Sequence, residues 1–247
     1  MVICKCDGTP EGILTAVFDA WEIDIKTSEI SVTPNDNMVL FGEYHEVVTD
    51  FSKAERVRRT VIRRISSYAY EMVFFACCST DPDRGNAVLQ FIRRGIKIGA
   101  DVVNDLKNHY VLKVFELYRN VKRELMHFRG FIRFRQQGKY LMAKYNPNND
   151  ILIPMADFFS DRFMRENFMI VDMNRNKAAV HYSCRDYFIT SVDREIIEQL
   201  KIEDSETEII ELWETFEKTI AIEARHNPKL QQQNMPLRFR DYMDLRK

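Results

Sequence analysis

The chain has 247 residues, 45% of them hydrophobic and 30% charged, with a formal net charge of −1. This is ordinary globular composition, with enough residues for one large domain or two modest ones. No segment approaches the roughly 18–20 apolar residues of a membrane span, and the first residues lack the apolar run of a signal peptide, so we expect a cytoplasmic protein with no membrane partner.

The charges are segregated along the chain although they nearly cancel overall. Residues 53–64 hold six basic residues and one acid, and residues 122–135 hold five basic residues and one acid. Residues 193–217 hold ten acids and two bases. A chain patterned in this way can present a basic face while it stays neutral as a whole.

In chain order, the first predicted elements are a short strand at VICKC and a helix that begins after it. Thr9 suits the N-cap and Pro10 the first helical position, where its missing N–H costs nothing. Residues 37–49 have strand character. Residues 52–127 are predicted to be mostly helical, and in the first of these helices Arg56, Arg59 and Arg63 share a face separate from the apolar one.

After these helices, the spacing of the apolar residues changes from the helical period to the period of two that is typical of a strand. In FIRFR, residues 131–135, apolar residues alternate with arginines, which is typical of a half-buried strand. KYLMAKY continues the pattern after QQG, so residues 131–144 are predicted to form a hairpin. A short helix in 154–166 and a second hairpin around NRN, residues 174–176, complete a β-β-α-β-β module for which we expect antiparallel pairing.

These elements predict one α+β domain over residues 1–247, as a single compact chain. Within it, 1–127 is expected to be mainly helical, 128–192 to form the antiparallel sheet module, and 193–247 to be a C-terminal helical region. The acidic stretch leads into a helix in this last region, which is interpreted as a solvated face or as a docking surface for a basic partner.

No cofactor or metal site is indicated by the motifs. The sequence contains no phosphate-binding loop, no dinucleotide fingerprint and no cysteine pattern of an iron–sulfur cluster. Cys4 and Cys6 form a C-x-C without a second pair at the spacing of a zinc finger. Cys77 and Cys78 close an apolar run and are interpreted as buried thiols. We therefore expect no cofactor, no bound metal and reduced cysteines.

Three stretches carry a resemblance to a known family. DGTPEGILTAVFDAW resembles an N-terminal Tyr-Asp-Gly followed by a Glu-Gly-Leu-Leu helix, with Cys6 in place of the tyrosine. HFRGFIRFR is similar to His-Lys-Met-x-x-Phe-Val-Arg-Phe-Arg. EARHNPKLQQQNMPLRF is similar to a closing Arg-x-Asn-Pro and Met-Pro-x-x-Tyr-Trp, with Phe239 and Arg240 in place of Tyr-Trp. In this order and over nearly the whole chain, they resemble the family named probable DNA metabolism protein.

The resemblance implies a role in DNA modification or repair. Members of that family resemble accessory partners of a radical SAM protein of DNA-repair type, and some are fused to a uracil-DNA glycosylase domain. The family supplies no established catalytic residues to carry over. The resemblance thus predicts DNA and a radical SAM protein as partners, and it predicts no mechanism.

The arginines are the candidate nucleic-acid contacts, because phosphate contacts supply most non-specific affinity. The candidates are Arg56, Arg59, Arg63, Arg129, Arg133 and Arg135. For Arg133 and Arg135 in particular, the sequence leaves two interpretations open. They could meet phosphate from a rigid strand, or they could belong to a solvated sheet face paired with acids.

His127, Arg225 and Asn227 are the candidates for a catalytic site. His127 could act as a general acid or base, or it could cap a helix C-terminus. Arg225 and Asn227 lie where Pro228 ends a predicted helix and could form either a structural clamp or a site with His127. The primary hypothesis is a DNA-binding accessory protein. The alternatives are a cofactor-free enzyme acting on DNA and a protein-only interaction module.

Overall fold

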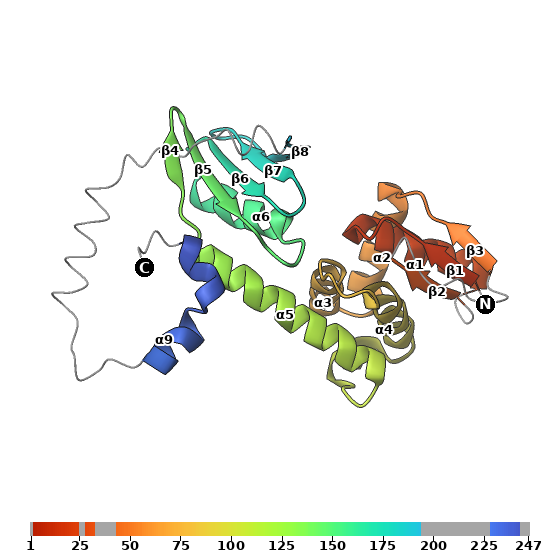
Figure 1. Cartoon of the computed structure of the whole chain (residues 1–247). Helices are drawn as coiled ribbons and strands as arrows, with labels where there is room; N and C mark the ends of the chain where they lie inside the picture. The colour runs from red at the N-terminus through yellow and green to blue at the C-terminus, as the bar shows by residue number, and fades with distance from the viewer. Residues whose placement is uncertain (1, 25–27, 33–42, 194–227, 243–247) are drawn as a thin grey trace. The chain divides into compact units, whose positions relative to one another are not determined.

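The computed structural model describes residues 2–24, 28–32, 43–193 and 228–242. The chain divides into two compact units, Met1–Arg123 and Glu124–Lys247, which can be followed by colour in Figure 1. Each unit combines helices with a sheet, so the α+β class is confirmed. None of the described helices is long and apolar enough to cross a membrane.

The first unit contains a three-stranded parallel sheet. Its strands are β1 (Val2–Lys5), β2 (Ser28–Ser31) and β3 (Glu43–Glu46), in the order β2-β1-β3. Helix α1 (Pro10–Asp24) connects β1 to β2, and such a crossover lets neighbouring strands run parallel. The strand at β1 and a strand within 37–49 were predicted, but β2 and the parallel pairing were not.

The remaining elements of the first unit are helices, which confirms the prediction for residues 52–127. They are α2 (Phe51–Arg64), α3 (Ser67–Cys77), α4 (Arg84–Ile98), the 3₁₀ helix η1 (Gly99–Asn104) and α5 (His109–Phe131), which continues past Arg123 into the second unit. Capping side chains mark the starts of α1 and α2. Thr9 Oγ1 accepts a hydrogen bond from Gly12 N at 3.0 Å, as predicted, and Asp50 Oδ1 accepts one from Ser52 N at 2.7 Å.

Close packing between α2 and α4 depends on a glycine. A Cβ atom at Gly95 of α4 would lie 2.4 Å from Cδ1 of Ile65, which follows α2 directly. Without a side chain at Gly95, α4 can approach the end of α2 and bring its own apolar residues beside it. Ile65 is itself buried. Other residues of α2 and α4 line the groove described below.

The second unit contains a five-stranded sheet with α6 against it (Figure 1). The strands are β4 (Arg135–Gln137), β5 (Tyr140–Tyr145), β6 (Phe168–Asp172), β7 (Lys177–His181) and β8 (Phe188–Ser191), in that spatial order, and α6 is Leu152–Arg162. Both predicted hairpins are present. Gly138 has a φ of +60° in the two-residue loop between β4 and β5, a conformation that glycine adopts without strain.

Two details of the predicted sheet module were wrong. Residues 131–134 do not form a strand, because α5 continues to Phe131 and β4 begins at Arg135. The pairing between β5 and β6 is parallel, since α6 returns the chain to the other end of the sheet before β6 starts. The pairs β4–β5, β6–β7 and β7–β8 are antiparallel, as expected.

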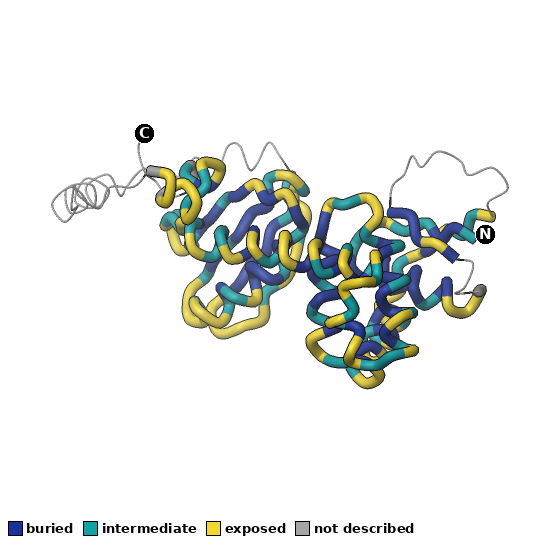
Figure 2. Tube along the Cα trace, turned by 90° about the horizontal axis from the view of Figure 1, so that it is seen from below, coloured by how far each residue is buried: buried dark blue, intermediate teal, exposed yellow. Residues whose placement is uncertain are grey.

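Each unit has an apolar interior, drawn in dark blue in Figure 2. The C-terminal elements are α9 (Pro228–Asn234), whose described side chains are exposed, and η3 (Leu237–Tyr242), which closes part of the interior of the second unit. Phe239 of η3 is buried, with its ring centroid 4.9 Å from that of Phe128 on α5. Most of the region predicted for 193–247, including the predicted acidic helix, lies outside the described residues.

Candidate nucleic-acid interface

A groove of about 590 Å³ runs between α1, α2 and α4 in the first unit. Its floor is apolar and includes Val17, Val61 and Ile92. Its charged and aromatic lining consists of Phe18, Trp21, Glu22, Arg56, Arg63 and Arg64. The groove therefore combines three cations with one acid, and it includes two aromatic rings.

The amphipathic pattern of α2 produces this arrangement. Val57 and Val61 face the interior, while Arg56, Arg63 and Arg64 are exposed. Residues three, four and seven apart lie on one face of a helix, so that Arg56 and Arg63 project from the same side. On α1, Val17 is buried one turn before Trp21, whose side chain remains 46% exposed.

The groove arginines are free of carboxylates. Within the described part of the chain, none of Arg56, Arg63 and Arg64 forms an ion pair with an acid. The guanidinium carbon of Arg56 lies 4.7 Å from the centroid of the Phe18 ring, a cation–π contact, and the residue is exposed. Lys53 Nζ, one turn earlier, is bound to Asp19 Oδ1 at 2.6 Å.

The other arginines of α2 are paired. Glu55 accepts from Arg58 Nε at 2.5 Å and from Arg59 Nε at 2.7 Å. These two hydrogen bonds lower the pKa of Glu55 to about 2. The predicted contact Arg59 thus shares the carboxylate of Glu55 with Arg58, whereas Arg56 and Arg63 are brought together in the groove.

The predicted contacts in the second unit are placed differently. Arg129 Nη2 donates to Pro154 O at 2.8 Å, and its guanidinium lies over the Phe158 ring. Burial lowers the pKa of Arg129. Arg133 Nη1 donates to Gly130 O and Ile132 O near the C-terminus of α5, and Arg135 is half-buried on β4 with an interaction of its own. Arg129 and Arg135 are therefore partly buried in the unit, whereas Arg133 is exposed and hydrogen-bonded to the end of its own helix.

Of the three catalytic candidates, only His127 lies among the described residues. His127 lies within α5, one turn before its end, and its ring stacks on Phe131 and on Phe239 at centroid distances of 5.6 and 4.8 Å. Arg225 and Asn227 lie outside the described residues. The environment of His127 is that of a packed aromatic side chain.

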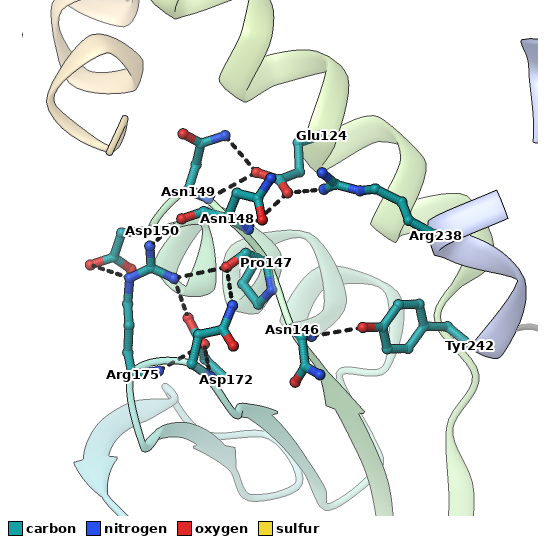
Figure 3. Close-up of polar contacts among 11 residues, drawn as sticks. Glu124, Asn146, Pro147, Asn148, Asn149, Asp150, Asp172, Arg175, Arg238 and Tyr242 are labelled. Carbon is teal, nitrogen blue, oxygen red and sulfur yellow. Dashed lines mark hydrogen bonds and ion pairs between the residues drawn. The ribbon is translucent and has the colours of Figure 1, made fainter. Parts of the chain in front are cut away.

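A polar cluster that the sequence did not suggest lies beyond the ends of β5 and β6 (Figure 3). Glu124 of α5 is buried and accepts from the backbone N–H groups of Asn148 and Asn149, each at 2.9 Å. The Arg238 guanidinium also bonds the Glu124 carboxylate, which ties η3 to α5. The hydroxyl of Tyr242 receives a hydrogen bond from Asn146 N at 3.2 Å.

Arg175 forms the second half of this cluster. Its guanidinium donates to Pro147 O at 3.2 Å, to Asn148 O at 2.6 Å and to the fully buried Asp172 at 3.0 Å (Figure 3). Burial raises the pKa of Asp172, and Arg175 opposes this increase. The cluster thus holds the loop 146–150 by its backbone. Its sequence signal was the run NPNND directly after a strand, which is rich in turn-forming residues.

No metal site is formed by the described residues, since they contain no group of three or more His, Cys, Asp or Glu side chains able to hold an ion. The side chains of Cys77 and Cys78 are buried, as predicted. Cys4 is buried and burial raises its pKa to about 11, so this thiol is protonated at neutral pH.

Comparison with known proteins places the chain in a family without assigning a function. No curated protein matches it. Residues 82–244, about two thirds of the chain, match the model of a family described as a domain of unknown function, DUF4130. The match begins just before α4 and extends beyond η3, so it covers the second unit almost completely but leaves out α1 and α2. The chain therefore belongs to the DUF4130 family.

Proposed function

We propose that this protein is a DNA-binding accessory protein in DNA modification or repair, working with a radical SAM partner enzyme. The observation that carries the DNA-binding part is the groove in the first unit, where Arg56, Arg63 and Arg64 are exposed and form no ion pair with any described carboxylate. The resemblance of three sequence stretches to the probable DNA metabolism family supports the pathway and the partner.

The groove has the properties that a phosphate backbone requires. A guanidinium stays charged at all physiological pH values and can contact a phosphate through two donors. Because α2 is held by buried Val57 and Val61, its arginines project from a rigid support. The net charge of the chain is −1, so DNA binding would depend on this local concentration of cations.

The proposal is tested by titrating a labelled DNA oligonucleotide with the full-length protein at several salt concentrations. The groove variant is Arg56→Gln/Arg63→Gln. We expect weaker binding on every sequence, and a log K versus log salt slope that is shallower by about 1.8 on duplex or about 1.4 on single strands for two lost phosphate contacts.

A matched control removes the same charge elsewhere in the first unit. Arg119 and Arg123 are exposed on α5, and the Arg119 guanidinium lies over the Phe115 ring as that of Arg56 lies over Phe18. Arg119→Gln/Arg123→Gln should leave the slope unchanged. Equal slopes for the wild-type protein and the groove variant, both folded, would contradict DNA binding in the groove and favour a protein-only interaction module.

The partner is tested separately with two purified proteins. The chain and a radical SAM protein of DNA-repair type from the same organism are mixed and examined by analytical ultracentrifugation. We expect a stoichiometric complex. Independent sedimentation of the two proteins, with and without DNA, would contradict the partnership and would leave the DNA-binding result standing by itself.

The enzymatic alternative receives no comparable support. His127 is stacked between two aromatic rings, and the hydrogen-bonded cluster around Glu124 and Arg175 has the loop 146–150 as its partner. These contacts are structural, because they hold a side chain or a loop of the chain in place. We therefore do not propose catalysis by this chain.

A further inference from the structure

We infer that the groove takes an unpaired nucleotide, with the base on the indole ring of Trp21 and the sugar–phosphate backbone along the arginines of α2. The protein would then bind single-stranded DNA in preference to duplex. This inference rests on the proposed DNA-binding function and names its substrate class.

The first support is the position of Trp21. An indole is among the largest apolar side chains, yet 46% of its surface is exposed at the groove. Every base has a π-face, so an exposed indole beside cations is a stacking platform that does not depend on sequence. Trp21 leaves this ring open to solvent, whereas the neighbouring Phe18 ring is already covered by Arg56.

The second support is the distribution of charge across the groove. The three arginines all come from α2, and the single acid of the lining, Glu22, comes from α1 next to Trp21. Glu22 repels phosphate from the α1 wall, and the arginines attract it to the α2 wall. A nucleotide bound in this field has its phosphate on α2 and its base toward Trp21.

The third support is the spacing of the cations. Arg56 and Arg63 are seven residues apart, which is about 10.5 Å along a helix. A single strand of DNA that runs along α2 can therefore contact Arg56 and Arg63 through two different phosphates. The groove volume of about 590 Å³ also lies within the range of roughly 300–1,000 Å³ that is usual for sites enclosing a molecule of small-ligand size.

Duplex DNA suits the groove less well. Proteins that read a duplex place a protruding helix, ribbon or arm into a groove of the DNA, because the bases are stacked inside it. Here the arginines and the indole line a recess in the protein. A duplex can meet the arginines at the rim, but its paired bases cannot reach Trp21.

The test compares three labelled oligonucleotides of equal length: a single strand, the same strand in duplex, and an abasic strand that keeps every phosphate. With wild-type protein we expect the single strand to bind more tightly than the abasic strand by about 5- to 150-fold, the effect expected of one stacked base. The duplex should bind close to the abasic strand. Trp21→Ala should remove the advantage of the normal strand, while Trp21→Phe should retain part of it.

A spectroscopic signal tests the stacking independently of affinity. The chain has two tryptophans, Trp21 and Trp213, so the Trp213→Phe variant leaves Trp21 as the single indole. Its fluorescence should be quenched by the single strand and not by the abasic strand. This variant also serves if Trp21→Ala fails to fold.

The outcomes separate the inference from the proposed function. Equal affinity for normal and abasic strands, or unchanged Trp21 fluorescence, overturns base stacking even if the groove arginines still carry the salt dependence. Tighter binding to duplex than to single strand overturns it as well. Displacement of DNA by a poly-glutamate peptide at the same charge concentration would assign the groove to an acidic peptide and overturn the inference. If the protein binds none of the three oligonucleotides, the proposed DNA-binding function is overturned as well.

Discussion

Two arginine-rich stretches of this chain have opposite surroundings. On α2, Arg56, Arg63 and Arg64 line an open groove without carboxylate partners in the described residues. Around the end of α5, Arg129 and Arg133 donate to backbone carbonyls of their own unit. The comparison teaches that a cluster of arginines in a sequence predicts a function only when their donors are unoccupied, and occupancy depends on contacts distant in sequence.

The largest loss in the free energy of unfolding is expected when an arginine with several hydrogen-bonded donors is removed from the second unit. In Arg175→Ala the buried carboxylate of Asp172 loses its ion pair, and two carbonyls of the loop 146–150 lose a donor. Breaking a buried pair in this way costs about 3–5 kcal/mol. Urea unfolding measures the difference from wild type. Arg185→Ala, at an exposed arginine of the same unit, is the control and should change stability by less than about 0.5 kcal/mol.

The loss of stability in Arg175→Ala should depend on pH. Burial raises the pKa of Asp172 above its ordinary value of 3.8, and the positive charge and hydrogen bonds of Arg175 make this increase smaller. A carboxyl whose folded pKa is raised adds stability below its unfolded pKa and loses that contribution as the pH rises through the folded pKa. Without Arg175 the folded pKa rises further, so the loss of stability in Arg175→Ala should become smaller as the pH is lowered from neutral toward the ordinary carboxyl pKa of 3.8. A deficit that is constant with pH would mean that Asp172 is not the group left unpaired.

A smaller effect is expected at Arg129. Arg129→Met keeps the apolar stem of the side chain but removes the hydrogen bond to Pro154 O and the cation–π contact with the Phe158 ring. The lost hydrogen bond has a charged donor, and such bonds contribute about 1.5–3 kcal/mol. Thermal unfolding would measure the loss. A variant as stable as wild type would show that Arg129 is available for a partner, and the contrast between the two arginine-rich stretches would weaken.

The effect at the end of α5 should be smaller again. Arg133 places a cation at a helix C-terminus and donates to Gly130 O and Ile132 O. Its replacement by Gln should cost about 0.3–1 kcal/mol, because interactions at a helix end are screened by solvent. The same variant should leave the salt dependence of DNA binding unchanged. A shallower salt slope for folded Arg133→Gln would instead support the phosphate contact that the sequence suggested.

The least effect on folding is expected at the groove. Arg56→Gln and Arg63→Gln remove exposed charges with no carboxylate partner in the described residues, so the free energy of unfolding should change by less than about 0.5 kcal/mol each. Chemical unfolding of both variants provides the measurement. A large loss at either position would assign these arginines to the fold and remove the basis for the groove as a binding site.

Local patterns predicted much of the fold. The Thr9 cap, the helical run from 52 to 127 and the two hairpins follow from capping, periodicity and turn chemistry, which act within a few residues. The short strand β2 and the parallel pairing of β5 with β6 depend on contacts across helices, and no local period encodes them. In FIRFR the alternation was real, since Ile132 is buried and Arg133 exposed, but the backbone there ends a helix.

The groove was predictable from the sequence only where local helix geometry determines it. The basic face of α2 was visible in the spacing of Arg56 and Arg63, because that spacing is set by the helix itself. The role of Trp21 was not visible, because it depends on α1 packing against α2. The cluster around Glu124 joins residues up to 114 positions apart, and its members carry no shared motif.

The central claim is that the arginines of α2 are open to DNA while those of the second unit are held by the fold. Modification of the full-length protein by phenylglyoxal, read by peptide mass spectrometry with and without a single-stranded oligonucleotide, tests both halves at once. We predict that Arg56, Arg63 and Arg64 react in the free protein and become protected by DNA, while Arg129 and Arg175 react slowly in both states. Unchanged reactivity of the three groove arginines on adding DNA, or protection centred on Arg133 and Arg135, would contradict it.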